Sequence, residues 1–192
     1  MSKREISEAA QADLVRRRTD AVELVSHDRA WKKQFQQIAR QVQSICGERI
    51  IAVHHIGSTS VPGLAAKPLI DLLPVLRSHE DGEACANFLE PQGFFYLADY
   101  GIPGRHFFRQ REPLNINMHM FEQGSIEIER HVVFRDALRR DTDLRKAYQT
   151  LKQGLAKKFP NDVDSYAKSK SDFIEKVLHD LGAPARPNGP DR

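Results

Sequence analysis

The most informative stretch of this chain reads His54-His55-Ile56-Gly57-Ser58-Thr59-Ser60-Val61-Pro62-Gly63-Leu64-Ala65-Ala66-Lys67-Pro68-Leu69-Ile70-Asp71. Residues 49–55 are short, β-branched and apolar, which is typical of a strand. Glycine, serine, threonine and two prolines follow in residues 57–68, so we expect a structured loop there. Residues 69–76 are again short and apolar, interrupted by Asp71. The pattern predicts two strands joined by a polar loop, with an acid near the start of the second strand.

This loop carries groups suited to phosphate chemistry. Gly57 lets the backbone approach a ligand closely, and Ser58 and Thr59 supply hydroxyls and main-chain N–H donors that fit phosphate oxygens. Lys67 adds a compact positive charge. Asp71 is an ionisable group in an apolar strand, where a carboxylate normally has a cation or a metal as its partner. Two simpler interpretations stay open: the loop is an ordinary turn, and Asp71 caps a neighbouring turn or pairs with an arginine.

The rest of the pattern predicts an α+β chain, with mixed strands first and helices after them. Helices are expected at residues 4–18, 28–46, 81–89, 131–159 with a break near Asp141, and 164–181, and further strands at 94–98, 106–109 and 114–121. Apolar and polar residues alternate in the last of these strands. Asn117 and His119 should therefore lie on the face opposite Met118.

Composition excludes several classes of protein. The chain has 192 residues, with 29 Lys and Arg against 26 Asp and Glu, a balance that speaks against RNA binding through a broadly basic surface. Its two cysteines have no CxxC spacing, which favours a reduced, cytoplasmic protein. No apolar run is long enough to span a bilayer, so no membrane association is expected. The sequence leaves the oligomeric state open.

Two long motifs resemble the GrpB family. One is the stretch from His55 to Asp71, and the other is Arg130-His131-Val132-Val133-Phe134-Arg135-Asp136-Ala137-Leu138-Arg139, followed by Tyr148, Leu151-Lys152 and the Tyr166/Lys170/Phe173 segment. The resemblance covers residues 22–181, which we interpret as one domain whose residues 130–181 are its helical part. Residues 1–21 would then be an N-terminal extension and residues 182–192 a flexible tail.

The resemblance implies a nucleotidyltransferase (polymerase-beta-like) fold, a mixed sheet with flanking helices and a C-terminal helical part. Members of the family also occur fused to dephospho-coenzyme A kinase. Active nucleotidyltransferases carry Gly-Ser, then an acid-x-acid pair on the next strand, and a third acid on a neighbouring strand. Gly57-Ser58 matches the first element and Asp71 the first acid, but Leu73 stands at the second acid position. A leucine cannot bind a metal, so the sequence departs from the two-metal pattern.

The third position also departs from the family pattern. GrpB relatives tend to show His-x-His where this chain has Asn117-Met118-His119. If this strand lies beside that of Asp71, the side chains of Asp71, His119 and Asn117 converge and form a site for a divalent metal, Mg, Mn or Zn. The alternative is a neutral His119 hydrogen-bonded to Asp71.

Basic residues in or beside the motifs are further candidates for binding phosphate. These are Arg109, Arg135 and Lys152, since guanidinium and ammonium groups match phosphate oxygens. Asp136 can instead pair with an arginine. His55 adjoins the glycine turn and is expected to support the site residues from behind.

Together these features predict that the chain binds a nucleotide or a phosphorylated metabolite. In one hypothesis Asp71 and His119 are catalytic in metal-assisted nucleotidyl or phosphoryl transfer. In the other, the missing carboxylate at Leu73 marks a catalytically degenerate binding or accessory module.

Overall fold

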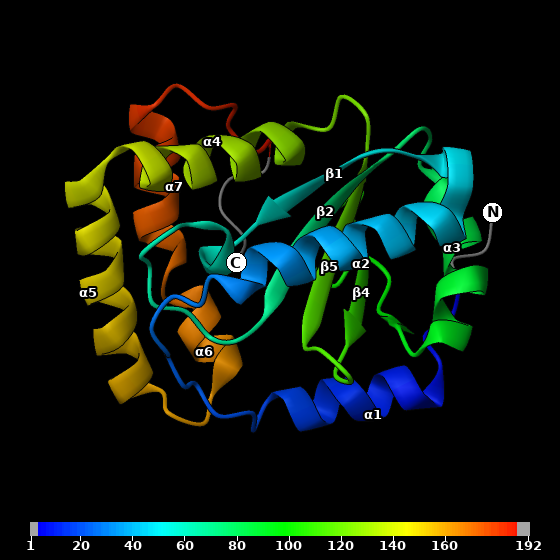
Figure 1. Cartoon of the computed structure of the whole chain (residues 1–192), viewed down its shortest axis with the longest axis horizontal. Coiled ribbons are helices and arrows are strands. Elements are labelled where there is room, and N and C mark those ends of the chain that lie inside the picture. The colour runs from blue at the N-terminus through cyan, green and yellow to red at the C-terminus, as the bar shows by residue number, and fades with distance from the viewer. Residues whose placement is uncertain (1–3, 188–192) are drawn as a thin grey trace.

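Five strands form one mixed sheet in the order β1-β2-β5-β4-β3 (Figure 1). The computed structural model describes residues 4–187. The strands are β1 (Ile50–Ile56), β2 (Ile70–Leu76), β3 (Phe95–Tyr96), β4 (His106–Gln110) and β5 (Ile116–Glu122). The helices are α1 (Glu8–Arg17), α2 (Ala30–Cys46), α3 (Glu80–Leu89), α4 (Ile126–Arg140), α5 (Thr142–Lys158), α6 (Val163–Lys168) and α7 (Ser171–Asp180). The predicted α+β class is confirmed.

The register of the sheet places the sequence motifs side by side. Strand β2 pairs antiparallel with β1 and parallel with β5, and β5 pairs antiparallel with β4. Asp71 on β2 lies opposite Asn117 on β5, which in turn lies opposite Arg109 on β4. Directly opposed residues project from the same face of a sheet. The three side chains therefore form one cross-strand row.

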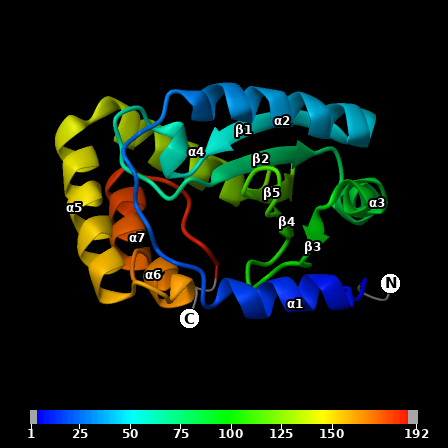
Figure 2. The same ribbon diagram turned by 60° about the horizontal axis from the view of Figure 1, so that its bottom comes forward.

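Helices α2 and α3 cover the other face of the sheet (Figure 2). Trp31, Ile38 and Val42 of α2 are buried there with Leu72 and Met118. Asp28 begins this helix by accepting a hydrogen bond from the Ala30 N–H at 2.8 Å, and Gly47 ends it with a positive φ of 61°. The predicted alternation of residues 114–121 is confirmed, because Met118 packs against α2 and α3 while Asn117 and His119 face away.

The second acid position is buried in an apolar cluster on the face that carries Asp71. Leu73 has no exposed surface and packs with Ile56, Val75 and Phe121 beneath α4. A carboxylate in this place would lose its hydration without gaining a partner. Leu73, which stands where active nucleotidyltransferases have their second acid, is therefore a residue of the hydrophobic core.

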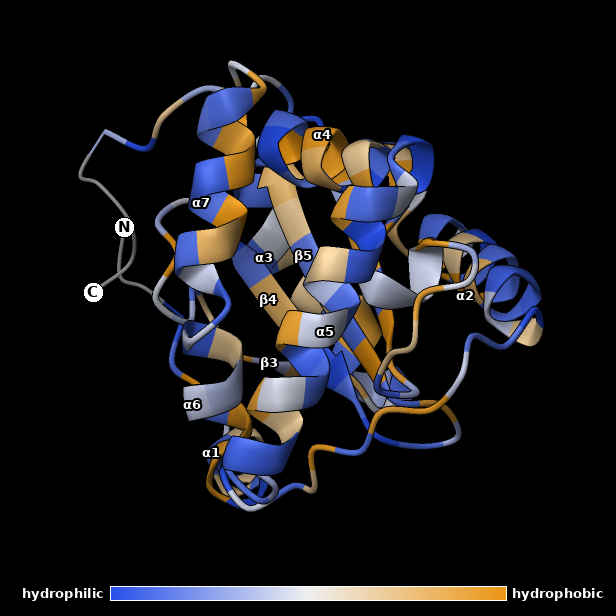
Figure 3. Cartoon of the chain, turned by 90° about the vertical axis from the view of Figure 1, so that its left-hand side faces the viewer, coloured by the Kyte–Doolittle hydropathy of each residue, from blue (hydrophilic) through white to orange (hydrophobic). Residues whose placement is uncertain are grey.

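The C-terminal third of the chain is a group of four helices, of which α4 packs on the sheet (Figures 1 and 3). The predicted break near Asp141 is confirmed, since its carboxylate caps α5 by accepting from Asp143 N–H and Leu144 N–H. Helix α7 turns its hydrophobic residues toward α4 and α5 (Figure 3). None of the helices within residues 4–187 is long and apolar enough to cross a membrane.

One helix prediction is wrong. Residues 164–181 were expected as a single helix, but α6 ends at Lys168 and α7 starts at Ser171. The Lys170 N–H bonds the Ala167 carbonyl three residues back, which tightens the chain and ends α6. The break turns Lys170 into a cavity beside Asp71.

The two terminal segments are docked where the structure describes them. Helix α1 lies under the edge of the sheet formed by β3 and β4 (Figure 2), with Ala10 buried against Leu97 and Phe107. The tail after α7 was expected to be flexible over residues 182–192. Within residues 182–187, however, Arg186 forms a bidentate pair with Glu127 at 2.7 and 2.9 Å; residues 188–192 lie outside the described residues.

Candidate functional site

The turn at Gly57 holds the start of the loop against Asp71. Gly57 has φ 68° and ψ −177°, a conformation essentially restricted to glycine. A Cβ atom on Gly57 would lie 2.1 Å from Oδ2 of Asp71 and 2.8 Å from its Cγ. The lack of a side chain therefore brings the backbone of the Gly-Ser-Thr loop into direct contact with the carboxylate.

We expect Gly57→Ala to lower the free energy of unfolding by about 2–5 kcal/mol, since backbone strain and displacement of Asp71 add together. Chemical denaturation measures this change. The matched control is Gly63→Ala, because Gly63 also has a positive φ, 78°, but has no atom within 4 Å of the added Cβ. Gly63→Ala should cost about 1–2 kcal/mol. Equal losses in the two variants would show that contact with Asp71 has no special role.

Thr59 and His55 hold the loop in place. The Thr59 hydroxyl donates to the Leu69 carbonyl at 3.0 Å, so it must accept from His55 Nε2, 3.2 Å away. Burial lowers the pKa of His55 to about 4, and its ring stacks on Phe35 with a centroid distance of 4.5 Å. His55 thus lies behind the loop, at the Thr59 hydroxyl, and its supporting role stays a prediction. The Thr59 hydroxyl is occupied by these two bonds.

Ser58 faces a buried lysine. Lys152 Nζ lies 3.1 Å from Ser58 Oγ and also donates to the Ala65 carbonyl, so one side chain of α5 ties both ends of the loop. The Lys152 side chain is 1% exposed. Burial, together with the charge of Lys170, lowers its pKa to about 7.

Two further lysines line the same space. Lys170 lies at the break between α6 and α7, with its Nζ 4.5 Å from the centroid of the Tyr166 ring. Burial lowers its pKa to about 8 despite the opposing charge of Asp71. Burial also lowers the pKa of Lys67, with the charge of Arg17 acting in the same direction.

These groups surround a cavity of about 470 Å³, which we call the lysine cavity. Its walls contain eight of the residues that the sequence predicted for the site: Ser58, Thr59, Lys67, Asp71, Arg109, Asn117, His119 and Lys152. Six Lys and Arg side chains line it against three Asp and Glu side chains. The structure thus collects positive charge in one place, although the net charge of the chain is only +3.

Asp71 is held by its two neighbours on β5. Asn117 Nδ2 donates to Asp71 Oδ1 at 3.2 Å, and His119 Nε2 lies 3.7 Å from the same oxygen. Burial raises the pKa of Asp71, but the hydrogen bonds of His119 and Asn117 and the charge of Lys170 outweigh it and leave the pKa below its usual value. Asp71 is therefore ionised at neutral pH.

Arg105 fixes the tautomer of His119. Its guanidinium lies 3.2 Å from His119 Nδ1 and can only donate, so Nδ1 is the acceptor and the ring proton sits on Nε2, facing Asp71. Burial lowers the pKa of His119 to about 4. The geometry corresponds to the interpretation of a neutral His119 beside Asp71.

The predicted metal ligands do not fit a resident divalent metal. His119 Nδ1 accepts from Arg105, its Nε2 carries the ring proton 3.7 Å from Asp71 Oδ1, and the Asn117 amide turns its N–H₂ group toward Asp71. Among residues 4–187, no group of three or more His, Cys, Asp or Glu side chains is placed to hold a metal ion. A metal in this position would have to replace the proton on Nε2 and break the bond from Arg105.

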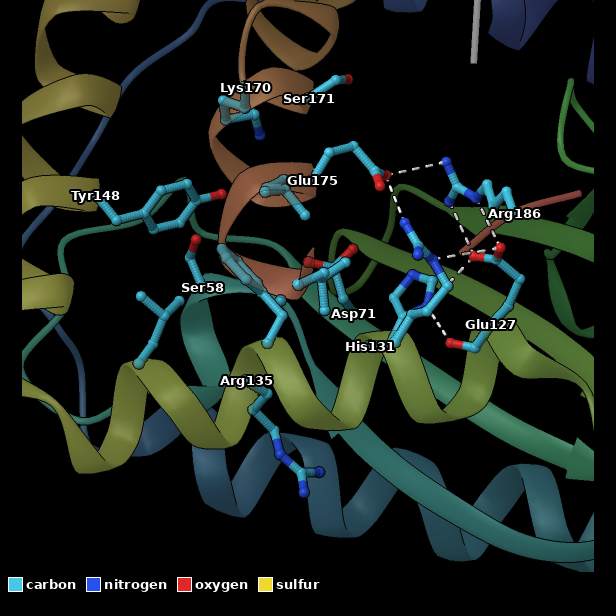
Figure 4. A pocket seen from close by; sticks show the side chains of 16 residues that line it. Ser58, Asp71, Glu127, His131, Arg135, Tyr148, Lys170, Ser171, Glu175 and Arg186 are labelled. Carbon is cyan, nitrogen blue, oxygen red and sulfur yellow. Dashed lines mark hydrogen bonds and ion pairs between the residues drawn. The ribbon is translucent and has the colours of Figure 1, made fainter. Parts of the chain in front are cut away.

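Two predicted phosphate ligands are already paired. Arg109 is 3% exposed and forms an ion pair with Asp13 of α1 at 3.2 Å. Arg135 forms a bidentate pair with Asp136 at 2.8 and 2.9 Å and donates to the His55 carbonyl. Figure 4 shows the Arg135 side chain directed away from Asp71. The structure does not bring Arg135 to the lysines.

A second cavity, the helical cavity (Figure 4), shares Ser58, Asp71 and Lys170 with the lysine cavity. It has a volume of about 270 Å³. Phe134, Leu138, Tyr148, Ile174 and Leu178 supply much of its apolar wall, and Glu127, Glu175, Arg130 and Arg186 form an ion-paired cluster at its far end. Asp71 therefore lies between a cationic cavity and a partly apolar one.

Lys170, Arg105 and Tyr148 line or contact the site but are not among the residues predicted for it, although Lys170 and Tyr148 stand in the GrpB motif. Lys170 had a detectable signal, because it follows Tyr166 by four residues and precedes Phe173 by three, which places a lysine in an apolar stripe. Arg105 had no such signal, since it lies on the loop before β4 and its contact with His119 of β5 is tertiary.

Comparison with known proteins identifies the family of this chain. Residues 21–180 match the GrpB protein family model. The chain belongs to the GrpB family. It is 36% identical over 155 residues to the UPF0157 protein YqkA of Bacillus subtilis, covering 80% of this chain but only 45% of that protein. The predicted membership is confirmed.

A solved structure of the conserved protein GrpB from Enterococcus faecalis has a TM-score of 0.76 and 34% identity, and the match covers 82% of this chain and 96% of that one. The dephospho-CoA kinase of Mycolicibacterium paratuberculosis is also similar to this chain. It is 26% identical, and the match covers 80% of this chain and 44% of the kinase.

The fold extends to nucleotidyltransferases. The Cid1 poly(U) polymerase in a structure with Mg 3′-dATP bound has a TM-score of 0.50 at 12% identity, covering 91% of this chain and 55% of that one. Identity this low shows the fold alone. The predicted nucleotidyltransferase-like architecture is confirmed on that basis.

Proposed function

We propose that this GrpB family protein binds the phosphate group of a nucleotide or phosphorylated metabolite in the lysine cavity. The observation that carries the proposal is the set of three lysines, Lys67, Lys152 and Lys170, around Ser58. None of them forms an ion pair with a carboxylate within residues 4–187, and burial lowers the pKa of each. Lys152 is buried and Lys67 and Lys170 are half-buried, and a buried charged group in a protein normally has a partner. An anionic ligand supplies the missing partner.

The charge of the three lysines and Asp71 fits a phosphate monoester. Three ammonium groups against the carboxylate of Asp71 leave a charge of about +2 when all are ionised, which matches a phosphate dianion with charge near −2 at pH 7. Ser58 Oγ adds a hydroxyl at the same place, 3.1 Å from Lys152 Nζ. A phosphate there would gain charge-assisted hydrogen bonds from protein groups.

Two asparagines in the wall of the lysine cavity suit the body of such a ligand. The side-chain oxygens of Asn115 and Asn117 are buried and have no hydrogen-bond partner within residues 4–187. Buried acceptors of this kind are satisfied by donors. Hydroxyl or amino groups of a sugar or a base would fill that requirement beside Asp71.

Of the two hypotheses, binding without two-metal transfer has the stronger support. Leu73 is packed in the core, and the ligand set Asp71, His119 and Asn117 does not fit a metal. Asp71 then serves to accept hydrogen bonds from the ligand and to anchor the Gly57 turn. The chain spans less than half of the length of YqkA and of the dephospho-CoA kinase relative, so the activity of a longer protein can use this domain as its binding module.

Isothermal titration calorimetry tests the proposal with inorganic phosphate, AMP and adenosine. We expect phosphate and AMP to bind at pH 7 and adenosine to bind much more weakly, because adenosine lacks the anion. A protein that binds adenosine as tightly as AMP, or binds neither phosphate nor AMP at millimolar concentration, would contradict the proposal.

Divalent metal should not be required. We expect EDTA to leave the dissociation constant for AMP within about twofold, and saturating Mg²⁺, Mn²⁺ or Zn²⁺ to improve it by less than about threefold, since the ammonium groups already neutralise the phosphate. Titrations with and without each metal give the answer. Binding that appears only with a metal would restore the hypothesis of metal-assisted transfer.

A further inference from the structure

Arg109 and Arg111 form a second group of cations in the wall of the lysine cavity. Asp71, Asn117 and Arg109 lie in one cross-strand row, and neighbouring strands are about 4.8 Å apart, so the backbone of Arg109 is about 10 Å from that of Asp71. The two arginines therefore lie one strand beyond Asn117, within reach of an extended anion that starts at Lys152 and Lys170.

Carboxylates of the N-terminal segment cover these arginines. Asp13 pairs with Arg109 at 3.2 Å and also with Arg111, and its side chain is only 2% exposed. Asp20 lies 3.0 Å from Arg111 and 3.8 Å from Arg109, and it lines the cavity. Both acids come from residues that precede the part matching the GrpB model, which begins at residue 21.

These ion pairs leave a hydrogen-bond donor of Arg109 without a partner among the described residues. The Arg109 side chain is 3% exposed, and its Nε has no hydrogen-bond partner within residues 4–187. A guanidinium presents five N–H donors in a fixed plane, and a carboxylate with two oxygens does not use all of them. A phosphate with three free oxygens would use more.

We propose that Arg109 and Arg111 are a second anion subsite for the distal phosphates of a polyphosphate, and that Asp13 and Asp20 occupy it as carboxylate competitors. The inference rests on the proposed function, because the first phosphate must lie at the lysines. It makes the N-terminal segment a selectivity element: with Asp13 and Asp20 in place the cavity favours a ligand with one phosphate. A ligand with several phosphates must displace Asp20.

The test compares inorganic phosphate with inorganic triphosphate by calorimetry on the full chain and on Asp20→Asn. Asp20 is 25% exposed at its side chain, so this variant disturbs the fold less than one at Asp13. We expect Asp20→Asn to bind triphosphate about tenfold more tightly and phosphate within about twofold of the parent. Asp143→Asn is the matched control for net charge, since Asp143 is 94% exposed on α5, and it should change neither constant.

Hydrogen exchange on the unmodified chain gives a second readout. Triphosphate should speed amide exchange around Asp20, in the segment that follows α1, because the contact of its carboxylate with the arginines is displaced, whereas phosphate should not. If the parent binds phosphate but Asp20→Asn gains no affinity for triphosphate and exchange around Asp20 is unchanged, the subsite is wrong and the lysine site stands. If the parent binds no phosphate at all, the proposed function itself fails.

Discussion

Lys152→Met is expected to weaken binding of phosphate and AMP by about 100-fold, or about 2.7 kcal/mol, while leaving the protein folded. The substitution keeps the length of the side chain and removes the ammonium group that lies 3.1 Å from Ser58 Oγ. Calorimetry at pH 7 measures the loss. Lys157→Met on the exposed side of the same helix is the control and should bind as the parent does.

The stability of the empty protein separates a ligand-binding lysine from a structural one. Folding lowers the pKa of Lys152 from 10.5 to about 7. The buried ammonium therefore destabilises the empty protein at and below pH 7, on the order of 1.4 kcal/mol per pKa unit. Lys152→Met removes this destabilisation, but it also removes the hydrogen bond to the Ala65 carbonyl, which costs about 1 kcal/mol. We expect Lys152→Met to unfold at an equal or higher denaturant concentration. A large loss of stability would instead make Lys152 a structural residue.

Binding should weaken strongly with rising pH. An anion binds the protonated lysines, and in the empty protein Lys152 and Lys170 have pKa values of about 7 and about 8. Both charges are present below pH 7 and are lost as the pH rises through these values. We expect affinity for AMP to fall by about two to three orders of magnitude between pH 7 and pH 9, a range in which its phosphate stays a dianion.

The stability of the empty protein changes with pH in the opposite direction to ligand binding. Because the folded-state pKa values lie below the unfolded value of 10.5, the unfolded chain holds more protons between pH 7 and pH 9, and these lysines make stability rise with pH. Lys152→Met should remove the part of the binding profile centred near pH 7 and keep the part near pH 8. An affinity that is constant from pH 7 to pH 9 would contradict the assignment of both lysines.

Local patterns predicted the sheet well. The alternation of Asn117, Met118 and His119 follows from the two-residue period of a strand, and the strand of Asp71 follows from a short continuous apolar run. The cap at Asp141 is also local. The break at Lys170 was missed, since an amphipathic stripe continues through it and only a tertiary contact, its entry into the cavity, accounts for it.

The site was harder to predict than the fold. Ser58, Asp71 and Lys152 lie together because a loop, a strand and a later helix meet, and the family resemblance supplied that meeting. Partner choice is decided by distant residues: Asp13 is 96 residues from Arg109 along the chain, and Arg105 sets the proton of His119 from the loop before β4. No spacing rule links such pairs. The predicted metal ligands are the clearest example, because only the hydrogen bond from Arg105 shows that His119 has no free lone pair.

The most direct test of phosphate binding at these lysines is an NMR titration of the Lys152 side chain, with its signal assigned by its loss in Lys152→Met. Without ligand the pKa should lie near 7, and saturating phosphate should raise it markedly, since an adjacent anion favours the ammonium form. A pKa near 10.5 without ligand, or a value that phosphate leaves unchanged, would contradict the central claim that a buried, unpaired ammonium at Ser58 is the anion site of this protein.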